Sequence, residues 1–389
     1  MERIKRSRIY AVLLCVLTVC TLTACEGNST SATARSKTQE HTEIEGLEWQ
    51  ERADLSYAEG FVIEKYAEGF RLITVSEDAQ YLIVPEGGEA PQGLKNDIRV
   101  INQPVSDIYL AATAVMDMFR SLDALDTIAF SGADAKGWYI AEAKQAVESG
   151  AMRYAGKYSA PDYEMLLSDN CSLAIENTMI LHTPEVKEQL EQLGITVLVD
   201  SASNESHPLG RIEWVKLYGT LLGKEAEAER IFDEQVKTFT EIEQQVQKSG
   251  QSVVIFYLTE NGAASVRSPS DYMVKMIETA GGNYIFDDLE TDGQKSTSMT
   301  IQMETFYTRA KSVDYLIYNN SIGGEYENLE ALLKKEPLLA DFDAVKENHV
   351  WCVPKSLYQE SMSTGELITD LYAILNEETP QTTYLYHLE

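Results

Sequence analysis

The sequence predicts an α/β protein of two lobes joined by one long helix, with a short β meander before the first lobe. The longest stretch with helical periodicity is residues 208–249, where bulky apolar residues recur mostly three or four positions apart. Gly223 divides this stretch into a first helix and a second one of about 24 residues, which would be roughly 36 Å long. Such a helix can cross between two domains, although a surface helix of one large domain gives the same pattern.

Residues 208–249 are here called the spine. Short apolar runs alternate with helical stretches on both sides of it. Before it, the runs are 107–111, 127–130, 171–175 and 195–199, with helical stretches at 113–122, 139–148 and 185–193. After it, the runs are 252–258, 283–286, 313–318 and 350–353, with helical stretches at 271–280 and near Met303. Strands that alternate with helices form largely parallel sheets. The residues before the spine and those after it are therefore each predicted to form one lobe.

The leading meander consists of three short runs, at 61–65, 70–75 and 81–84. A chain of 389 residues with 44% hydrophobic residues is long enough for two cores. The predicted organisation is a signal peptide at 1–24, a flexible tether at 25–46, the N-terminal lobe with its meander at 47–218, the linker helix at 219–249, the C-terminal lobe at 250–360, and a C-terminal helix and tail at 361–389.

The N-terminus has the anatomy of a secretory signal: a basic cluster, an apolar run at 9–22 and small residues after it. The run is short for a membrane span. Leu22-Thr23-Ala24-Cys25 resembles the lipobox of bacterial lipoproteins, which implies cleavage before Cys25 and attachment of lipid to its sulfur. Cys25 is therefore the predicted membrane anchor, with a plain secretory signal as the alternative. The segment 26–46 has only Ile44 as a bulky apolar residue and is predicted to be a flexible tether.

The composition excludes several classes of partner. The formal net charge is −30, and the signal segment carries a cationic excess, so the remaining body is strongly acidic. The negative electrostatic potential of this body repels nucleic acid and anionic lipid surfaces and favours cationic partners. Beyond the signal only Cys171 and Cys352 remain besides Cys25; a disulfide between them is possible, but two buried thiols are the preferred prediction.

Motifs of catalysis are absent from the sequence: it has no G-x-S-x-G, P-loop, H-E-x-x-H, G-x-G-x-x-G or C-x-x-C. This argues against an enzyme. The histidines expected in the folded part show no close pair at metal-ligand spacing; they are His182, His207, His349 and His387. We therefore expect neither a metal site nor a cofactor.

Aromatic side chains are the best candidates for ligand contact, because the sequence has 21 tyrosines and many fall at or after the predicted carboxyl ends of strands. In open α/β sheets the loops at those ends line the ligand crevice. The candidates are Tyr109, Trp138, Tyr139, Tyr154 and Tyr158 from the first lobe, and Tyr257, Tyr318, Trp351 and Tyr358 from the second. Some of them would be core aromatics. Arg211 and Arg267 could hold carboxylate, catecholate or phosphate oxygens, or could form surface salt bridges.

Four segments carry a resemblance to a known family: HPLGRIEWVKLYGTLLGKEAEAERIF, DYEMLLSDNCSLAIE, YMVKMIETAGGNYIF and MTIQMETFYTRAKSVDYLIY. In this order and spacing, residues 57–377 resemble the class III substrate-binding lipoproteins of bacterial ABC importers, which have a rigid helical linker and serve iron-siderophore, haem and cobalamin uptake. The resemblance implies two α/β lobes with the ligand between them, and a permease dimer with ATPase subunits as partner. It also implies that one glutamate per lobe pairs with permease arginines; the matching positions are Glu164 and Glu304.

The sequence departs from this class in its leading meander, and it lacks the histidine set of zinc-binding relatives, which argues against metal-ion transport. The leading hypothesis is an extracytoplasmic, lipid-anchored, monomeric receptor for a bulky iron chelate, with a corrinoid or haem as alternatives. Two arginines among many tyrosines favour a hydroxamate-like or mixed chelate. One rival is a secreted glycosidase-like enzyme, which needs Glu164 and Glu304 within about 10 Å of each other. Another is an adhesion or sensor lipoprotein of the same fold.

Overall fold

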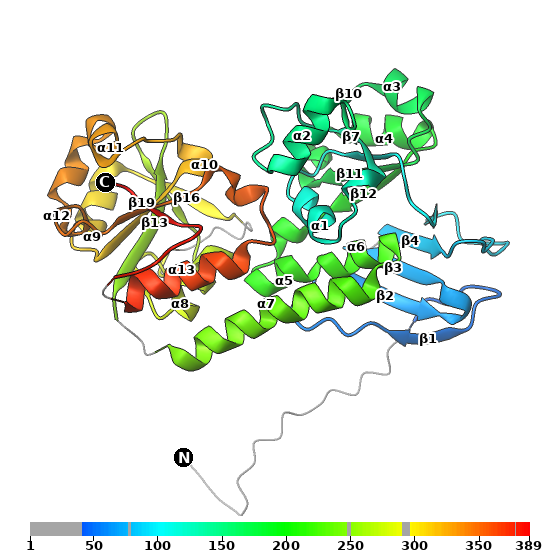
Figure 1. Ribbon diagram of the computed structural model, residues 1–389, viewed down its shortest axis with the longest axis horizontal. Coiled ribbons are helices and arrows are strands. Elements are labelled where there is room, and N and C mark those ends of the chain that lie inside the picture. Colours follow the sequence, from blue (N-terminus) through cyan, green and yellow to red (C-terminus); the bar gives the residue numbers. More distant parts are fainter. Residues whose placement is uncertain (1–40, 77–78, 247–249, 290–295, 378) are drawn as a thin grey trace, which may run out of the picture. The chain divides into compact units, whose positions relative to one another are not determined.

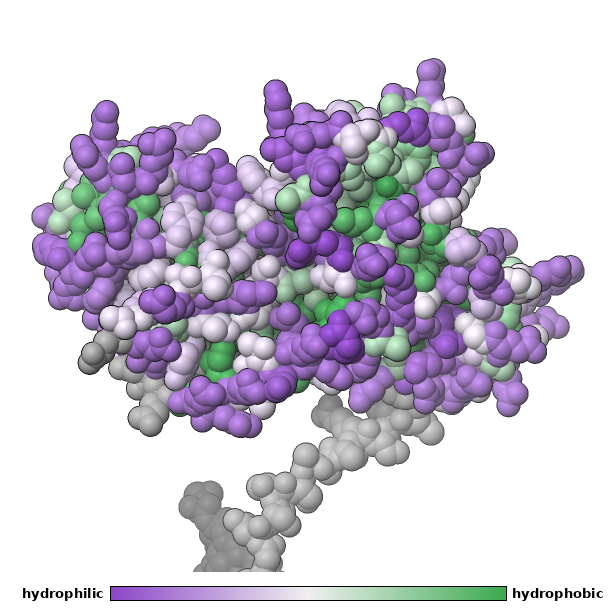
Figure 2. All heavy atoms as spheres, viewed as in Figure 1, coloured by the Kyte–Doolittle hydropathy of each residue, from purple (hydrophilic) through white to green (hydrophobic). Residues whose placement is uncertain are grey.

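The computed structural model describes residues 41–76, 79–246, 250–289, 296–377 and 379–389 (Figure 1). The predicted signal peptide, Cys25 and most of the predicted tether lie outside the described residues. None of the helices in the described ranges combines the length and the hydrophobicity that crossing a membrane requires. Figure 2 shows a predominantly hydrophilic face with smaller groups of apolar residues, as expected for so acidic a chain.

The N-terminal sheet has five strands, in the order β1 (Trp49–Arg52), β2 (Phe61–Tyr66), β3 (Arg71–Val75), β4 (Ala79–Val84) and β5 (Ile98–Asn102). The first four are antiparallel, as the predicted meander requires, and β5 is parallel to β4. Alternate residues face opposite sides. Ile63 and Ile73 belong to the main core, whereas Tyr66 and Leu72 belong to a smaller core on the other side.

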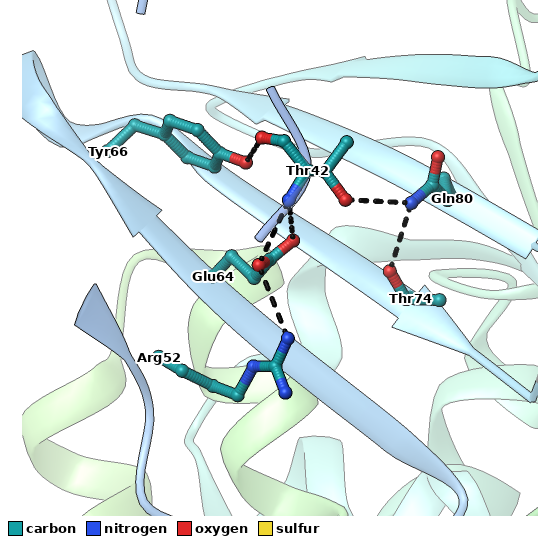
Figure 3. A network of polar contacts seen from close by, with 6 residues as sticks. All are labelled: Thr42, Arg52, Glu64, Tyr66, Thr74 and Gln80. Carbon is teal, nitrogen blue, oxygen red and sulfur yellow. Dashed lines mark hydrogen bonds and ion pairs between the residues drawn. The ribbon is translucent and has the colours of Figure 1, made fainter. Parts of the chain in front are cut away.

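The predicted tether extends to residue 46, but Thr42 and Ile44 already contact the N-terminal sheet. Ile44 is buried in its smaller core. The Thr42 N–H donates to the Glu64 carboxylate at 3.3 Å, and the Tyr66 hydroxyl donates to the Thr42 carbonyl (Figure 3). Gln80 donates to the Thr42 hydroxyl at 3.3 Å. One buried isoleucine and these hydrogen bonds are enough to order a polar segment that composition alone describes as flexible.

The first lobe has a parallel sheet of β12 (Thr196–Asp200), β11 (Leu173–Asn177), β6 (Ile108–Leu110), β7 (Ile128–Ser131) and β8 (Arg153–Tyr154). Its helices are α1 (Val115–Ser121), α2 (Ala141–Ser149), α3 (Tyr163–Ser168) and α4 (Pro184–Gln192), and a small ribbon pairs β9 (Gly156–Lys157) with β10 (Ala160–Pro161). The Tyr81 hydroxyl on β4 donates to the Val197 carbonyl on β12 at 2.8 Å, which fixes the N-terminal sheet to this lobe.

The spine consists of α5 (Pro208–Glu213), α6 (Val215–Leu222) and α7 (Glu225–Gln245). Gly223 has a left-handed φ of 68° and separates α6 from α7, since glycine takes this conformation without steric cost. α7 is 21 residues long and packs against α6 and against the C-terminal helix α13 (Thr364–Asn376) (Figure 1). It buries Ile231, Phe232 and Phe239. The predicted apolar stripe is therefore the face that joins the spine to the rest of the protein.

The second lobe has parallel central strands and antiparallel edges. Its strand order is β16 (Ser298–Ile301), β14 (Ala264–Arg267), β13 (Ser252–Leu258), β17 (Tyr315–Asn319), β18 (Val350–Val353) and β19 (Tyr386–His387), with β15 (Asn283–Tyr284) paired to β13. Its helices before α13 are α8 (Tyr272–Thr279), α9 (Met303–Ala310), α10 (Asn320–Gly323), α11 (Leu329–Lys335) and α12 (Asp343–Lys346). The tail predicted to follow the lobe instead returns to its sheet as β19.

Cys171 and Cys352 are both buried and free. The preferred prediction of two buried thiols is therefore confirmed over the disulfide. Burial also raises the pKa of the Cys171 thiol to about 11 and that of the Cys352 thiol to about 12, so both are neutral at physiological pH.

Candidate ligand cleft

A cavity of about 160 Å³, here called the first cavity, lies between the two lobes. From the first lobe it is lined by Ala112, which follows β6, by Asn177 at the end of β11 and by Asp200 at the end of β12. From the second lobe it is lined by Tyr358, which follows β18. The cavity therefore lies at the carboxyl ends of parallel strands, where open α/β sheets bind their ligands.

A second cavity of about 280 Å³ adjoins the first. Ser203, Arg211 and Tyr272 line both cavities, which are together called the cleft here. The second cavity has a different chemistry: its lining residues include three acids and several hydroxyl groups, and they are Glu59, Ser203, Asn204, Glu205, Ser206, Arg211, Ser270, Asp271, Tyr272, Ser296 and Thr297.

Arg211 is the cation at this junction. Its guanidinium carbon lies 4.0 Å from the centre of the Tyr272 ring, which is a cation–π contact between α5 and the first residue of α8. Within the described part of the chain, no carboxylate is paired with the guanidinium and no hydrogen bond is made by it. Its N–H groups are therefore oriented by Tyr272 but available to a ligand.

Tyr358 is held by a buried arginine behind the cavity wall. Arg267, at the end of β14, is only 4% exposed and donates to the Tyr358 hydroxyl. The Asn319 amide donates to the same hydroxyl at 3.2 Å. Arg267 lines neither cavity, so its position in the structure is that of a support for Tyr358. The phenol ring is thereby fixed at the wall of the first cavity.

Two buried aspartates flank the junction. Asp200 accepts a hydrogen bond from the Tyr218 hydroxyl at 2.7 Å, and burial raises its pKa to about 6 against the lowering effects of Tyr218 and Arg211. Asp271 caps α8, because its Oδ1 accepts the Met273 N–H at 3.0 Å. Burial raises the pKa of Asp271 as well, and Arg267 and Arg211 oppose that rise.

Two further glutamates fix residues 56–60, the segment that leads into β2. Glu213 is fully buried and accepts the N–H groups of Ser56, Tyr57 and Ala58 at 2.9, 2.8 and 2.8 Å. Glu205 accepts the N–H groups of Glu59 and Gly60 at 3.1 and 2.8 Å. These bonds bring Glu59 to the second cavity. The part of the chain predicted only as a leading meander thus contributes to the cleft.

Residues 359–362, which we call the interlobe strap, connect the second lobe to the first. Gln359 accepts the Tyr139 N–H at 2.8 Å and donates to the Gly137 carbonyl at 2.6 Å. The Ser361 hydroxyl donates to the Ala114 carbonyl at 2.8 Å, and the Met362 N–H donates to Asp117 at 2.7 Å. The Met362 carbonyl also accepts from Gln235 of α7 at 3.2 Å. The strap therefore joins both lobes and the spine beside the first cavity.

Of the predicted contact residues, Arg211 and Tyr358 line the cleft. Four others lie inside their lobes. The Tyr109 hydroxyl donates to the Gly156 carbonyl, the Trp138 indole N–H to the Ser131 hydroxyl and the Tyr318 hydroxyl to the Gly323 carbonyl, each at 2.9 Å. The Trp351 ring packs on His387. Tyr158 and Tyr257 pack on the lobe cores, whereas Tyr139 and Tyr154 are exposed. The lining residues not predicted include Tyr272, Tyr384 and Asp200. The sequence alone does not distinguish a tyrosine inside a buried strand from a tyrosine just beyond the end of that strand.

Glu164 and Glu304 occupy equivalent places in the two lobes. Each is the second residue of its helix, α3 or α9, and each is exposed. Their helices precede β11 and β17, which both have parallel neighbours on two sides. Neither residue lines the two cavities, so they do not form a pair of carboxylates across the cleft.

Comparison with known proteins decides the family. The model of the periplasmic binding protein family matches residues 114–357. The chain belongs to the periplasmic binding protein family. Proteins of this family bind substrates and are not enzymes, so the glycosidase alternative is wrong. The match begins after the N-terminal sheet, which means that β1–β5 lie outside the matched residues.

Individual relatives are distant. An uncharacterized lipoprotein of Methanocaldococcus jannaschii is 26% identical to this periplasmic binding protein over 302 residues, which are 74% of this chain and 69% of the relative. The haem-binding protein HutB of Vibrio cholerae has a TM-score of 0.55 at 17% identity, over 68% of this chain and 98% of HutB. The vitamin B12 binding protein BtuF of the same species has a TM-score of 0.50 at 15% identity, over 70% and 97%. These structures share the two-lobed fold.

Proposed function

We propose that this periplasmic binding protein is the lipid-anchored, extracytoplasmic substrate-binding component of an ABC importer, with an iron-siderophore or a related bulky chelate as its ligand. The observation that carries the proposal is Arg211, whose unpaired N–H groups stand at the junction of two cavities between the lobes. A binding protein needs such a site between its lobes, and the family match supplies the class of protein.

The chemistry of the cleft favours a hydroxamate-like or mixed chelate. A guanidinium is a planar fork that matches pairs of oxygen atoms, such as those of a hydroxamate or a carboxylate. Tyr272, Tyr358 and Tyr384 supply aromatic walls with polar tips. Among the described residues, Arg211 is the one arginine that lines the first and second cavities. A triscatecholate has a higher negative charge and would need several cations.

Replacing Arg211 by glutamine is expected to weaken binding of a ferric trihydroxamate about 10- to 100-fold, because a charged hydrogen-bond donor is lost from the cleft. Titration of the purified protein, followed by quenching of its intrinsic fluorescence, measures the affinity. Arg230→Gln is the matched control, since Arg230 is exposed on α7 and pairs only with Glu227 and Glu234 in the described structure. Haem, a corrinoid, zinc and manganese are titrated in parallel. Tight binding of haem, of a corrinoid or of a bare cation, with no binding of the chelate, would contradict the proposed ligand class.

The anchor proposal rests on Cys25 and on the similar M. jannaschii protein, which is named a lipoprotein. Changing Cys25 to serine should leave unprocessed or soluble precursor, because the sulfur that would receive the lipid is gone. Cell fractionation and incorporation of labelled fatty acid measure the outcome, with wild type as the reference. A cleaved Cys25→Ser protein that still sediments completely with membranes would refute the anchor.

We also propose that Glu164 and Glu304 contact the two halves of a permease dimer that works with ATPase subunits, and that the receptor acts as a monomer. Their equivalent positions, one per lobe, and their exposure support this arrangement. An arginine on each permease half would meet one carboxylate on each lobe. The proposal separates a transport receptor from an adhesion or sensor protein of the same fold, for which these acids would have no partner.

A further inference from the structure

We propose that the first cavity takes a compact apolar group of the ligand, and that the ring of Tyr384, in the C-terminal tail, recognises this group. The inference rests on the proposed function, because it concerns the same cleft. It adds the chemical class of one part of the ligand, a ligand-contact residue and a positioning residue, Asp370. Both residues lie after the family-matched residues 114–357.

The size of the first cavity limits what can enter it. Its volume of about 160 Å³ is close to the roughly 150 Å³ of an engineered apolar cavity that binds benzene. A whole ferric trihydroxamate is much larger than benzene. The first cavity therefore has room for one compact group of such a chelate, for example a phenyl or short alkyl group.

Apolar side chains form the wall behind the first cavity. Val115 and Met118 belong to α1, Leu367 belongs to α13, and Leu357 precedes the interlobe strap. These four side chains are almost fully buried, so they shape the cavity without supplying much of its accessible surface. The accessible apolar contact must come from other lining residues.

Tyr384 supplies such a contact. It is one of two aromatic residues that line the first cavity and are only half-buried; the other is Tyr358. The hydroxyl oxygen of Tyr384 is itself buried, so a ligand in the cavity meets the ring of this side chain and not its hydroxyl. Aromatic rings contribute most to binding where they meet apolar or aromatic groups.

Asp370 of α13 fixes the backbone of Tyr384. Its Oδ2 accepts the N–H groups of Tyr384 and Leu385 at 2.6 and 2.7 Å, and its carboxylate also accepts the Thr383 N–H at 3.1 Å. Asp370 is 1% exposed, so these hydrogen bonds are shielded from water. The chain then continues into β19, which pairs with β18. Tyr384 is therefore held at the cavity wall before a ligand arrives, and binding does not have to order the tail.

Arg211 and Tyr384 can contact different parts of one ligand. Arg211 lines both cavities and can bind oxygen atoms, whereas Tyr384 lines only the first. A chelate whose hydroxamate oxygens meet Arg211 can place the acyl group of that hydroxamate in the first cavity. The acyl group is therefore the part of the ligand to vary.

The test uses two linear ferric trihydroxamates that differ only in the terminal acyl group, which is benzoyl in one and acetyl in the other. Wild-type protein is expected to bind the benzoyl form about tenfold more tightly, because phenyl buries more apolar surface than methyl and meets an aromatic ring. Tyr384→Ala should lose this preference and keep its affinity for the acetyl form within about twofold. Tyr384→Phe, which keeps the ring, should retain the preference. Quenching of intrinsic fluorescence measures each affinity.

Asp370→Asn tests the positioning role. It weakens the hold on the Tyr384 backbone, so it should lower the ratio of the two affinities, and adding Tyr384→Ala to it should lower that ratio little further. A residue that only stabilises the fold would weaken binding of both forms alike and leave the ratio unchanged. If Asp370→Asn does not fold, the Tyr384 variants decide alone.

Tyr154→Ala is the matched control, because Tyr154 is an exposed tyrosine that lines neither cavity. Three results would each overturn the apolar subsite while leaving the proposed function intact: equal affinity of wild type for the two forms, equal losses for both forms in Tyr384→Ala, or the same loss in Tyr384→Phe as in Tyr384→Ala. Binding of neither form would overturn the chelate class and the apolar subsite together.

Discussion

Cells that produce the double variant Glu164→Arg, Glu304→Arg are expected to lose uptake, while the purified protein keeps its ligand affinity and its melting temperature. Both side chains are exposed, and both lie outside the two cavities. As acids in the first turns of α3 and α9, they contribute about 0.3 to 1 kcal/mol each through the helix dipole, so their reversal leaves the protein folded. Arginine facing a permease arginine would repel it. The single variants should have milder effects.

The measurement compares uptake of labelled ligand with the affinity of the purified variant. The matched control is Glu48→Arg with Glu243→Arg, which changes the charge equally at exposed positions before β1 and on α7. Uptake at the wild-type rate in the Glu164→Arg, Glu304→Arg variant would show that these residues do not dock. Loss of affinity together with uptake would place the defect in the cleft instead.

Glu176 is expected to make the protein less stable as the pH rises. This β11 residue is fully buried, and neither of its carboxylate oxygens has a hydrogen-bond partner among the described residues. Burial raises its pKa from 4.5 to about 8. The neighbouring titratable groups are Tyr109 and Tyr163, whose own pKa values are raised in turn by burial and by Glu176. Glu176 is therefore a neutral acid inside the first lobe at physiological pH.

The sign of the effect follows from proton binding. Between pH 4.5 and about 8 the folded state keeps the proton on Glu176 and the unfolded state releases it, so the free energy of unfolding falls as the pH rises. The full loss above pH 8 is roughly 4 to 5 kcal/mol. Glu176→Leu should abolish this dependence and make the protein more stable at pH 8 to 9.

Urea unfolding at pH 5, 7 and 9 gives the required free energies. Glu188→Leu, at an exposed position of α4, is the control for adding an apolar residue to the same lobe. Parallel pH profiles of wild type and Glu176→Leu would show that the carboxyl is not the source of the dependence.

The fold was predictable where sequence periodicity is long or repeated. The spine, the two sets of parallel strands and the meander all follow from runs of apolar residues at helical or strand spacing. The strands β1 and β19 were missed because a short edge strand buries few side chains and leaves little pattern. β5 was missed although Ile98 and Ile101 are buried, because its polar residues interrupt the run.

The cleft was less predictable because it is assembled from distant parts of the chain. Arg211 stood out as a rare cation in an acidic sequence, and Tyr358 as an aromatic residue after a strand. Nothing local distinguishes Glu59, Glu205 or Asp271 from the many other acids, since their roles depend on which backbone groups and cavities they meet in the folded protein. Tyr109 and Tyr318 were chosen by the same rule as Tyr358, but they lie within strands and are fully buried.

The interlobe strap has a consequence for the rates of ligand exchange. Its four hydrogen bonds to the first lobe come from Gln359, Ser361 and Met362. If separating the lobes on this side breaks all four, at about 1 kcal/mol net each, the open form is populated at roughly one molecule in a thousand. Spontaneous escape of a bulky ligand by this route would then be slow, and a long residence time would follow. A permease that pulls the lobes apart would supply the free energy needed to break these hydrogen bonds. The ligand would then be released mainly at the permease.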